Sequence, residues 1–223
     1  MHSYIAIQNT YDIFEMALFI NNQRVDYAYE DKRHTSKLFI PLLDQLLVRN
    51  SIHISNLSFC AVNCGPGPFS TLRSIIASVN GLHAATNIPL MSIDGLEALF
   101  LESYDKNYSN TIILLNAFNN EVYYLIAHQD KIIAKGYKPI TTFLVDIKQR
   151  LSNQPINFIG NGVTLHYNLI TNELGDNAII QENSPQFCSL EIIGRLGLDM
   201  FMHNKKTTDY LMPLHLKKHA VEL

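Results

Sequence analysis

Apolar and polar positions alternate in three short stretches near the start of the chain, at residues 4–8, 14–20 and 25–29. Alternation with a period of two predicts β-strands with one buried face. Short polar links such as Asn21-Asn22 predict hairpin turns between the strands. We therefore expect an antiparallel meander.

The pattern then changes to the period of a helix. Thr35–Arg49 carries apolar residues at positions 38, 39, 42, 43, 46 and 47, the spacing of an amphipathic helix. Leu57–Asn63 is a short apolar run that predicts a buried strand. Residues 71–86 form a second helical pattern, with Ser70 as its expected N-cap. A strand at 88–93 and a short helix at 95–104 follow.

The second half of the chain repeats this order. The predicted strands are 111–117, 122–128, 132–137, Ile156–Ile159 and 178–181, and the predicted helices are 142–151 and Leu190–Met202, with the stretch near 163–173 left unassigned. Two βββαβ units in tandem predict a duplicated α/β fold in which helices flank mixed sheets. We expect an N-terminal subdomain at 1–106 and a C-terminal subdomain at 107–223.

Composition narrows the class of protein. With 47% apolar and 17% charged residues, the 223-residue chain should fold around a sizeable core. A net charge of −3 argues against a broad nucleic-acid-binding face. The sequence shows no signal peptide and no long apolar run, so a cytoplasmic protein without a membrane span is expected. Cys60, Cys64 and Cys188 lack CxxC spacing and are expected to be reduced and structural.

Residues 65–73 read GPGPFSTLR, between the predicted buried strand and the second predicted helix. A P-loop needs GxxxxGK[ST], but no lysine occurs at this helix start, and Ser70 replaces the third glycine of a GxGxxG fingerprint. A vestigial anion site at Gly65, Gly67, Ser70 and Arg73 stays open, because a helix N-terminus offers unpaired N–H groups and Arg73 adds charge. We favour the alternative, a tight strand-to-helix corner.

The segment GPGPFSTLRSIIASVNGLHAATNIPLMSIDGLEAL resembles the TsaB (YeaZ) family, whose members carry GPGSFTGLR, a helix, an IPL-type strand and a Ser-Leu-Glu-Ala-Leu turn. The similarity includes HTSKL at 34–38 and continues more weakly at EVY, 121–123, and FIGNG, 158–162. The resemblance implies a duplicated ASKHA fold, which is actin-like and ribonuclease H-like. This agrees with the repeated βββαβ order.

The resemblance also implies a function in tRNA modification. In this family, TsaD transfers a threonylcarbamoyl group to N6 of adenosine 37 in tRNAs that read ANN codons. TsaB is its non-catalytic partner, and TsaE, an ATPase, joins them. We therefore expect a scaffold subunit with no catalytic residue, cofactor or metal. It would pair with TsaD, form a homodimer in isolation, and meet tRNA only indirectly through the complex.

The sequence departs from the patterns of the related families in two ways that concern metal and nucleotide binding. TsaD places a metal-binding His-x-x-x-His after its IPL-type strand, whereas residues 92–98 contain no histidine, so the chain is not expected to be a TsaD. Gln8 stands where many TsaB proteins have an aspartate, and Asn116-Ala117-Phe118 replaces Asp-Ala-Arg. An amide lacks the anionic oxygen that attracts a hydrated magnesium ion, so nucleotide binding is not expected.

The resemblance places the partner-binding surface on the helices Thr35–Arg49 and 71–86. The first helix has two adjacent apolar stripes, so that one can cover the sheet and leave the other for a partner. Internal cover for both stripes is the alternative. The predicted interface residues are Leu38, Leu42, Leu46, Ile75, Ile76, Val79 and Leu82.

Other functions remain as alternatives. A peptidase or chaperone-like activity would need a nucleophile and a base, and Cys64, Ser70, Ser74 and His83 lie close in sequence, but no GxSxG elbow is present. A small ASKHA kinase is disfavoured by the missing aspartates. The HxxxH pattern at 215–219 is expected to be a solvated tail, since the glutamate of HExxH is absent.

Overall fold

The computed structural model describes residues 2–151, 153–203, 207–214 and 216. The chain divides into two compact units. Unit 1 contains the described residues up to Ala98 together with those of Ser189–Leu214, and unit 2 contains Leu99–Cys188. Each unit is built on its own five-stranded sheet.

The sheet of unit 1 is mixed and has the strand order β3-β2-β1-β4-β5. Its strands are β1 (Ser3–Asn9), β2 (Ile13–Ile20), β3 (Gln23–Asp31), β4 (Leu57–Asn63) and β5 (Leu90–Ile93). The first three form the predicted antiparallel meander, β4 pairs in parallel with β1, and β5 pairs in parallel with β4. Asn21 and Asn22 form the first hairpin turn, both with the positive φ that asparagine tolerates.

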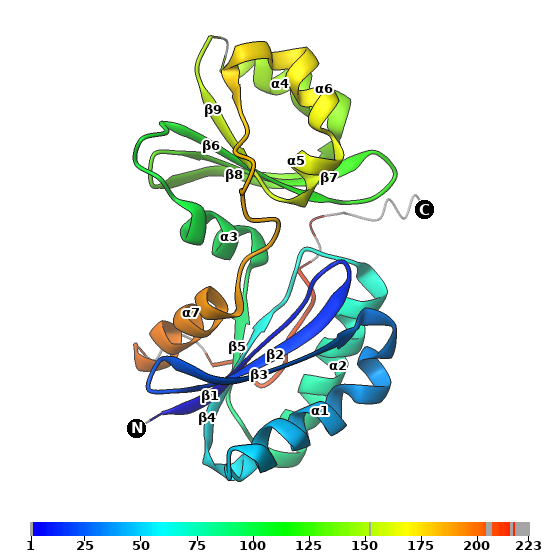
Figure 1. The fold of residues 1–223 in the computed structure, drawn as a ribbon, viewed down its shortest axis with the longest axis vertical. Helices are drawn as coiled ribbons and strands as arrows, with labels where there is room; N and C mark the ends of the chain where they lie inside the picture. Colours follow the sequence, from blue (N-terminus) through cyan, green and yellow to red (C-terminus); the bar gives the residue numbers. More distant parts are fainter. Residues whose placement is uncertain (1, 152, 204–206, 215, 217–223) are drawn as a thin grey trace. The chain divides into compact units, whose positions relative to one another are not determined.

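Helices cover both faces of this sheet. Helices α1 (Thr35–Arg49) and α2 (Phe69–Thr86) lie on one face, and α7 (Leu190–Met202) lies on the other (Figure 1). The turns η1 (Lys32–His34) and η2 (Ile54–Asn56) precede α1 and β4. Because side chains alternate along a strand, one face of β1 and β4 packs against α1 and α2 while the other packs against α7.

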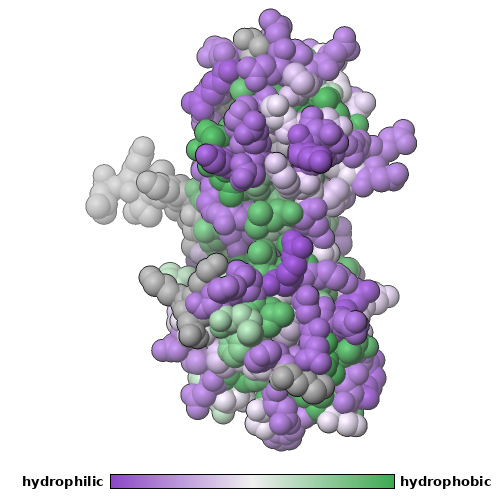
Figure 2. Space-filling view, turned by 90° about the vertical axis from the view of Figure 1, so that its left-hand side faces the viewer, coloured by the Kyte–Doolittle hydropathy of each residue, from purple (hydrophilic) through white to green (hydrophobic). Residues whose placement is uncertain are grey.

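Helix α7 belongs to unit 1, although its residues lie within the expected C-terminal range 107–223. The reason is the buried second face of the central strands, which needs an apolar cover. Gly197 allows a close approach, since a Cβ added there would lie 2.5 Å from the Cβ of Ala61. Figure 2 looks onto this side of the molecule, where hydrophilic and apolar side chains are intermixed over unit 1.

Unit 2 repeats the topology, with the strand order β10-β9-β6-β7-β8. Its strands are β6 (Asn110–Asn116), β7 (Glu121–His128), β8 (Lys131–Pro139), β9 (Ile156–Ile159) and β10 (Ala178–Ile179). Its helices are α4 (Ile140–Arg150), α5 (Asn161–Leu165), α6 (Tyr167–Leu174) and the turn η3 (Gly175–Asn177), while α3 (Gly95–Ser103) spans the division between the units. The shared strand order confirms the predicted duplicated α/β fold.

Two local expectations differ from the structure. The expected N-cap Ser70 is wrong, because α2 begins at Phe69 and its N-cap is Pro68. Pro68 has an extended backbone, and its carbonyl accepts a hydrogen bond from the N–H of Leu72. The unassigned stretch near 163–173 folds mostly as α5 and α6.

The three cysteines are free and buried, as expected for structural thiols. Burial raises the pKa of Cys60 to about 12 and that of Cys64 to about 11. Both thiols are therefore protonated at neutral pH, and the thiolate needed for nucleophilic attack is scarce. Within the described part of the chain, every helix is too short or too polar to cross a bilayer.

His166, between α5 and α6, is predicted to make the stability of the fold depend on pH. Its side chain is 5% exposed, its Nε2 atom has no hydrogen-bond partner among the described residues, and burial lowers its pKa. The folded state then binds fewer protons than the unfolded state. The stabilising contribution is therefore complete above the unfolded pKa of about 6.5 and is lost as pH falls through the folded pKa.

We expect the free energy of unfolding to decrease as the solution is acidified below about pH 6.5, and His166→Phe to reduce this slope. Urea unfolding followed by circular dichroism at a series of pH values measures it. An identical slope in the variant would exclude His166 as the source.

Candidate functional site

Residues 65–73, which carry the motif GPGPFSTLR and are called the signature loop here, connect β4 to α2. Both backbone polar groups of Gly65 in this loop are hydrogen-bonded. The N–H of Gly65 donates to Oδ1 of Asn63 over 2.9 Å, and the carbonyl of Gly65 accepts from the N–H of Gly95 over 2.7 Å. Gly65 has a φ of +108°, a region that favours glycine. A Cβ at this position would lie 2.8 Å from Cδ2 of Leu72. The chain's own groups therefore shape this corner.

The four residues of the predicted anion site lie on this corner and the first turns of α2. The guanidinium carbon of Arg73 lies 3.7 Å from the ring centroid of Phe69, so the cation stacks on an aromatic ring of its own helix. Ser70 is exposed and its carbonyl accepts a hydrogen bond from the hydroxyl of Ser74. Gly67 has open space around its Cβ position. The anion site stays a prediction.

Gln8 is the penultimate residue of β1, and its side chain is buried and hydrogen-bonded inside unit 1. It is 2% exposed, its Nε2 donates to Oε1 of Glu15 over 2.7 Å, and its Oε1 accepts from Nδ2 of Asn63 over 3.3 Å. The hydroxyl of Tyr27 donates to the other oxygen of Glu15 over 2.7 Å. A carboxylate in place of this amide would repel Glu15. The amide thus avoids a like-charge contact with Glu15 at this place in β1.

The predicted interface residues on α1 and α2 are mostly part of the core. Leu46, Ile75, Ile76, Val79 and Leu82 are buried in the cluster that joins the helices to their sheet, and Leu38 and Leu42 are partly buried. Internal cover, the alternative that the sequence left open, applies to these five side chains.

The two helices remain predicted as partner-binding elements, but other apolar side chains reach the solvent from them. Ile40 is 55% exposed, Val48 is 68% exposed and Phe69 is 44% exposed. On α1, Ile40, Asp44 and Val48 follow one another at intervals of four residues and so share one face. The periodicity of the apolar positions did not identify this face, because it is interrupted by the charged Asp44.

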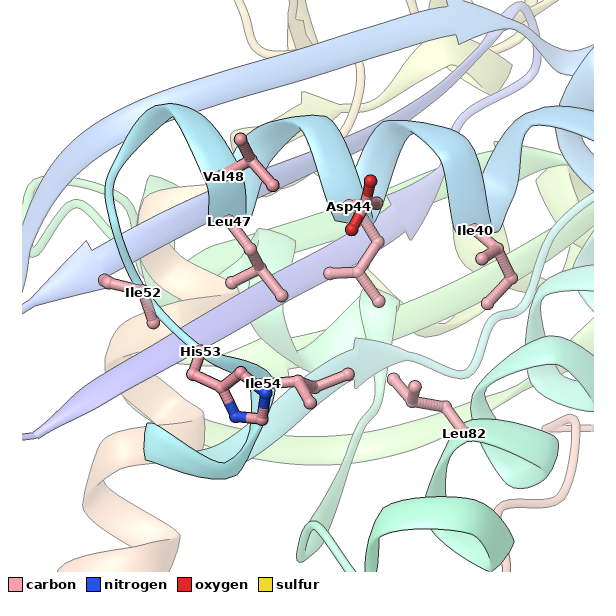
Figure 3. Close-up of a pocket in the computed structure, with 9 residues that line it drawn as sticks. Ile40, Asp44, Leu47, Val48, Ile52, His53, Ile54 and Leu82 are labelled. Carbon is pink, nitrogen blue, oxygen red and sulfur yellow. The ribbon is translucent and has the colours of Figure 1, made fainter.

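A groove of about 240 Å³ lies between this face of α1, the segment that leads into β4, and the C-terminal part of α2. We call it the α1–α2 groove. It is lined by Ile40, Leu43, Asp44, Leu47, Val48, Ile52, His53, Ile54 and Leu82. Figure 3 shows side chains from the three segments turned toward a common space.

A C-terminal strap, residues 207–214, is the part of unit 1 that sequence reasoning missed. Leu211 is fully buried in the core, and Asn80 of α2 clamps its backbone, accepting from its N–H over 2.8 Å and donating to its carbonyl over 3.0 Å. The N–H of Leu214 donates to the carbonyl of Cys64 over 2.8 Å, next to the signature loop. The signal was weak, because Leu211 is buried whereas the adjacent hydrophobic residues Tyr210 and Met212 are exposed, so residue type did not single it out.

His83, Ser74 and Cys64, considered as base and nucleophiles of a peptidase, are hydrogen-bonded to the backbone or buried. Nδ1 of His83 lies 2.8 Å from the carbonyl of Ile88, and the hydroxyl of Ser74 donates to the carbonyl of Ser70. Burial keeps the thiol of Cys64 protonated. Among the described residues, no cluster of three or more histidine, cysteine or acidic side chains could hold a metal ion. The histidines of the HxxxH pattern, His215 and His219, lie outside the described residues.

Comparison with known proteins gives matches along most of the chain. The family model described as "TsaD: tRNA N6-adenosine threonylcarbamoyltransferase" matches residues 28–197. The tRNA threonylcarbamoyladenosine biosynthesis protein TsaB of Haemophilus influenzae is 21% identical over 57% of this chain and 55% of its own length. The TsaB of Buchnera aphidicola subsp. Schizaphis graminum is 27% identical over 54% of this chain and 58% of its own length. These alignments thus span little more than half of the two relatives.

Among solved structures, a Pseudomonas aeruginosa protein described as similar to peptidase YEAZ superposes with a TM-score of 0.76 at 18% identity. The superposition covers 97% of this chain and all of that one. At this identity the likeness concerns the fold. The family match extends over well more than half of the chain and the curated relatives carry the name TsaB. The chain therefore belongs to the family that the TsaD model describes, and within it to the TsaB/YeaZ proteins.

Proposed function

We propose that this chain is the TsaB-type subunit of a tRNA threonylcarbamoyladenosine machinery, where it binds and activates a TsaD-type transferase. It performs no group transfer itself. The names of the relatives and the description of the matching family support the pathway. TsaE joins the pair in a larger complex, and the chain forms a homodimer when the transferase is absent.

The proposal rests on a contrast between two places in unit 1, the end of β1 and the helical face formed by α1 and α2. Near the end of β1, the amide of Gln8, which stands where the resemblance places an aspartate in many TsaB proteins, is hydrogen-bonded to Glu15 and Asn63. On the helical face, Ile40 and Val48 are exposed beside an apolar groove. Exposed apolar surface around a groove is typical of a protein-binding site.

The test is a reconstitution with the TsaD-type protein of the same organism. We expect the two chains to co-purify, and threonylcarbamoylation of an ANN-decoding tRNA to require this chain when the adenylate is supplied. Transfer at the same rate without the chain, together with a failure to co-purify, would refute the proposal.

A separate expectation concerns nucleotides. Titration of the isolated chain with ATP and magnesium in a calorimeter should give no specific heat of binding, because the amide of Gln8 cannot hold a hydrated magnesium ion. Tight binding accompanied by hydrolysis would instead support a kinase-like activity.

A further inference from the structure

We infer that a pocket in unit 2 binds a small monocarboxylate with an apolar body, either a single ring or a short hydrocarbon chain. The pocket has a volume of about 260 Å³ and is lined by the end of α4 and by the strands β6, β7 and β8. We call it the α4–β8 pocket. The inference is independent of the proposed function, which concerns the helices of unit 1.

The α4–β8 pocket lies at the end of the unit 2 sheet where β6 begins. Asn110 is the first residue of β6, and His128 is the last residue of β7. Both line the pocket, together with Arg150, the last residue of α4. Ligands of open α/β sheets usually bind outside the carboxyl ends of the parallel strands, and β6 reaches its carboxyl end at Asn116. The pocket is therefore at the opposite end of β6 from the place where the fold alone predicts a ligand.

The walls of the α4–β8 pocket select an apolar ligand body. Its apolar lining residues are Ile126, Ala127, Ile133, Ile147 and Leu151. Ile147 belongs to the core cluster of unit 2, and Ile126 and Leu151 pack against that cluster, so this part of the wall is preformed. Ile133 also lines the pocket but is 64% exposed. A ligand that covers Ile133 removes apolar surface from water, which is favourable.

The volume of the pocket limits the size of the ligand. A cavity of about 150 Å³ is enough to hold a benzene molecule. The α4–β8 pocket, at about 260 Å³, can hold one such ring together with a short chain. Pockets for drug-sized ligands are larger, about 300–1,000 Å³. The ligand is therefore a small molecule.

Arg150 supplies the charge that the ligand matches. It forms no ion pair within the described part of the chain, whereas Lys148 pairs with Glu173 over 2.9 Å and Asp146 pairs with Lys138. The pKa of Asp146 is lowered chiefly by its hydrogen bond with Lys138 and less by the charge of Arg150. The described lining contains no acidic residue. A single guanidinium is matched by a monoanion, and it binds a carboxylate through two parallel N–H groups.

The other polar groups of the lining leave this attraction to Arg150. Nδ2 of Asn110 donates to Oε1 of Gln154 over 2.9 Å and lies 3.5 Å from the carbonyl of Pro155, which can only accept. The carbonyl oxygen of the Asn110 amide therefore faces Nδ1 of His128 at 3.1 Å, so that Nδ1 carries the hydrogen and donates it. In the neutral ring Nε2 is then an acceptor, which does not attract a carboxylate.

Nuclear magnetic resonance titration of the isotope-labelled full chain with phenylacetate tests the inference. We expect a Kd of about 0.1–1 mM, the range for a ligand of this size, and changes in the backbone signals of residues 126–133 and 147–151. Phenylacetamide has the same apolar body without the charge and should bind about tenfold more weakly. Acetate has the charge without the body and should give no measurable binding. Octanoate distinguishes a hydrocarbon chain from a ring.

Two exposed substitutions, each with a matched control, assign the binding to this pocket. Arg150→Gln should weaken phenylacetate about tenfold and leave phenylacetamide unchanged, whereas Lys148→Gln makes the same change in charge on α4 outside the lining. Ile133→Thr should weaken both ligands about threefold, because it removes apolar wall. Its control is Val145→Thr on α4, where the side chain is 47% exposed and outside the lining. Both controls should bind as the wild type does, and melting curves by circular dichroism establish that all four variants fold.

Each outcome supports or overturns the inference. Tighter binding of octanoate than of phenylacetate, with the same dependence on Arg150, would support it and assign a hydrocarbon chain to the body. Equal affinity for the acid and the amide, or equal affinity of Arg150→Gln and the wild type, would overturn it. Signal changes confined to other segments, or no binding of either acid well above the expected Kd, would also overturn it. The proposed function is tested separately by reconstitution, so it stands or fails independently of these results.

Discussion

Replacing Val79 with glutamate is expected to unfold unit 1. Val79 is fully buried between α2 and its sheet, among apolar neighbours of the same core cluster. A carboxylate there loses its hydration without gaining a partner, at a cost on the order of 5 kcal/mol or more. That is comparable with the whole free energy of unfolding of a domain, about 5–15 kcal/mol.

Circular dichroism and size-exclusion chromatography of the purified variant measure this result. The matched control is Ala77→Glu, which places the same group on an exposed position of the same helix. It should fold normally and weaken binding of the TsaD-type partner if that part of α2 faces the partner. A normally folded Val79→Glu variant that has lost only its partner would show that Val79 faces the interface, against the burial seen in unit 1.

Leu211→Ala is expected to produce the second large effect, a loss of about 2–5 kcal/mol in the free energy of unfolding. Leu211 is fully buried and anchors the C-terminal strap in the core of unit 1. Truncation to alanine creates a cavity, and it also removes the apolar contacts that hold the strap against the core. The carbonyl of Cys64 and the side chain of Asn80 would then lose their bonds to the strap.

Urea unfolding at neutral pH measures the loss, with Met212→Ala as the control. Met212 is 68% exposed in the same strap, so its truncation should change stability by less than about 0.5 kcal/mol. Hydrogen exchange adds an independent readout, since Leu211→Ala should raise exchange at the N–H groups of Leu211 and Leu214, which donate to Asn80 and to the carbonyl of Cys64. Equal stabilities of the two variants would mean that the strap does not contribute to the core.

The elements of this fold could be predicted because each has a strong local pattern. The bounds of α1, β4, β9 and α7 agree with those expected from periodicity. The start of α2 was less predictable, because Ser70 is a good N-cap by residue type, whereas the chain turns at Pro68. Turn geometry around two glycines and two prolines depends on contacts with β4 and α3, which no local pattern contains.

The candidate site was predicted at the level of helices and less well at the level of side chains. An apolar stripe shows which residues seek cover, but it does not say whether the cover is the chain's own sheet or a partner. Leu46 and Val79 are covered by the core of unit 1, whereas Ile40 and Val48 are exposed to solvent. The α1–α2 groove is lined by α1, α2 and the segment before β4, which are brought together only by folding.

The sequence by itself determined the duplicated order of strands and helices, the membership in the TsaB/YeaZ proteins, and the amide at the end of β1. These follow from periodicity, from a contiguous motif and from residue type, all of which are local properties. Tertiary structure alone decided that α7 and the C-terminal strap complete unit 1, because the central strands are buried on both faces and the sheet edge at β5 needs a neighbour. It also decided which apolar side chains remain for a partner, because exposure is a property of the whole packed unit.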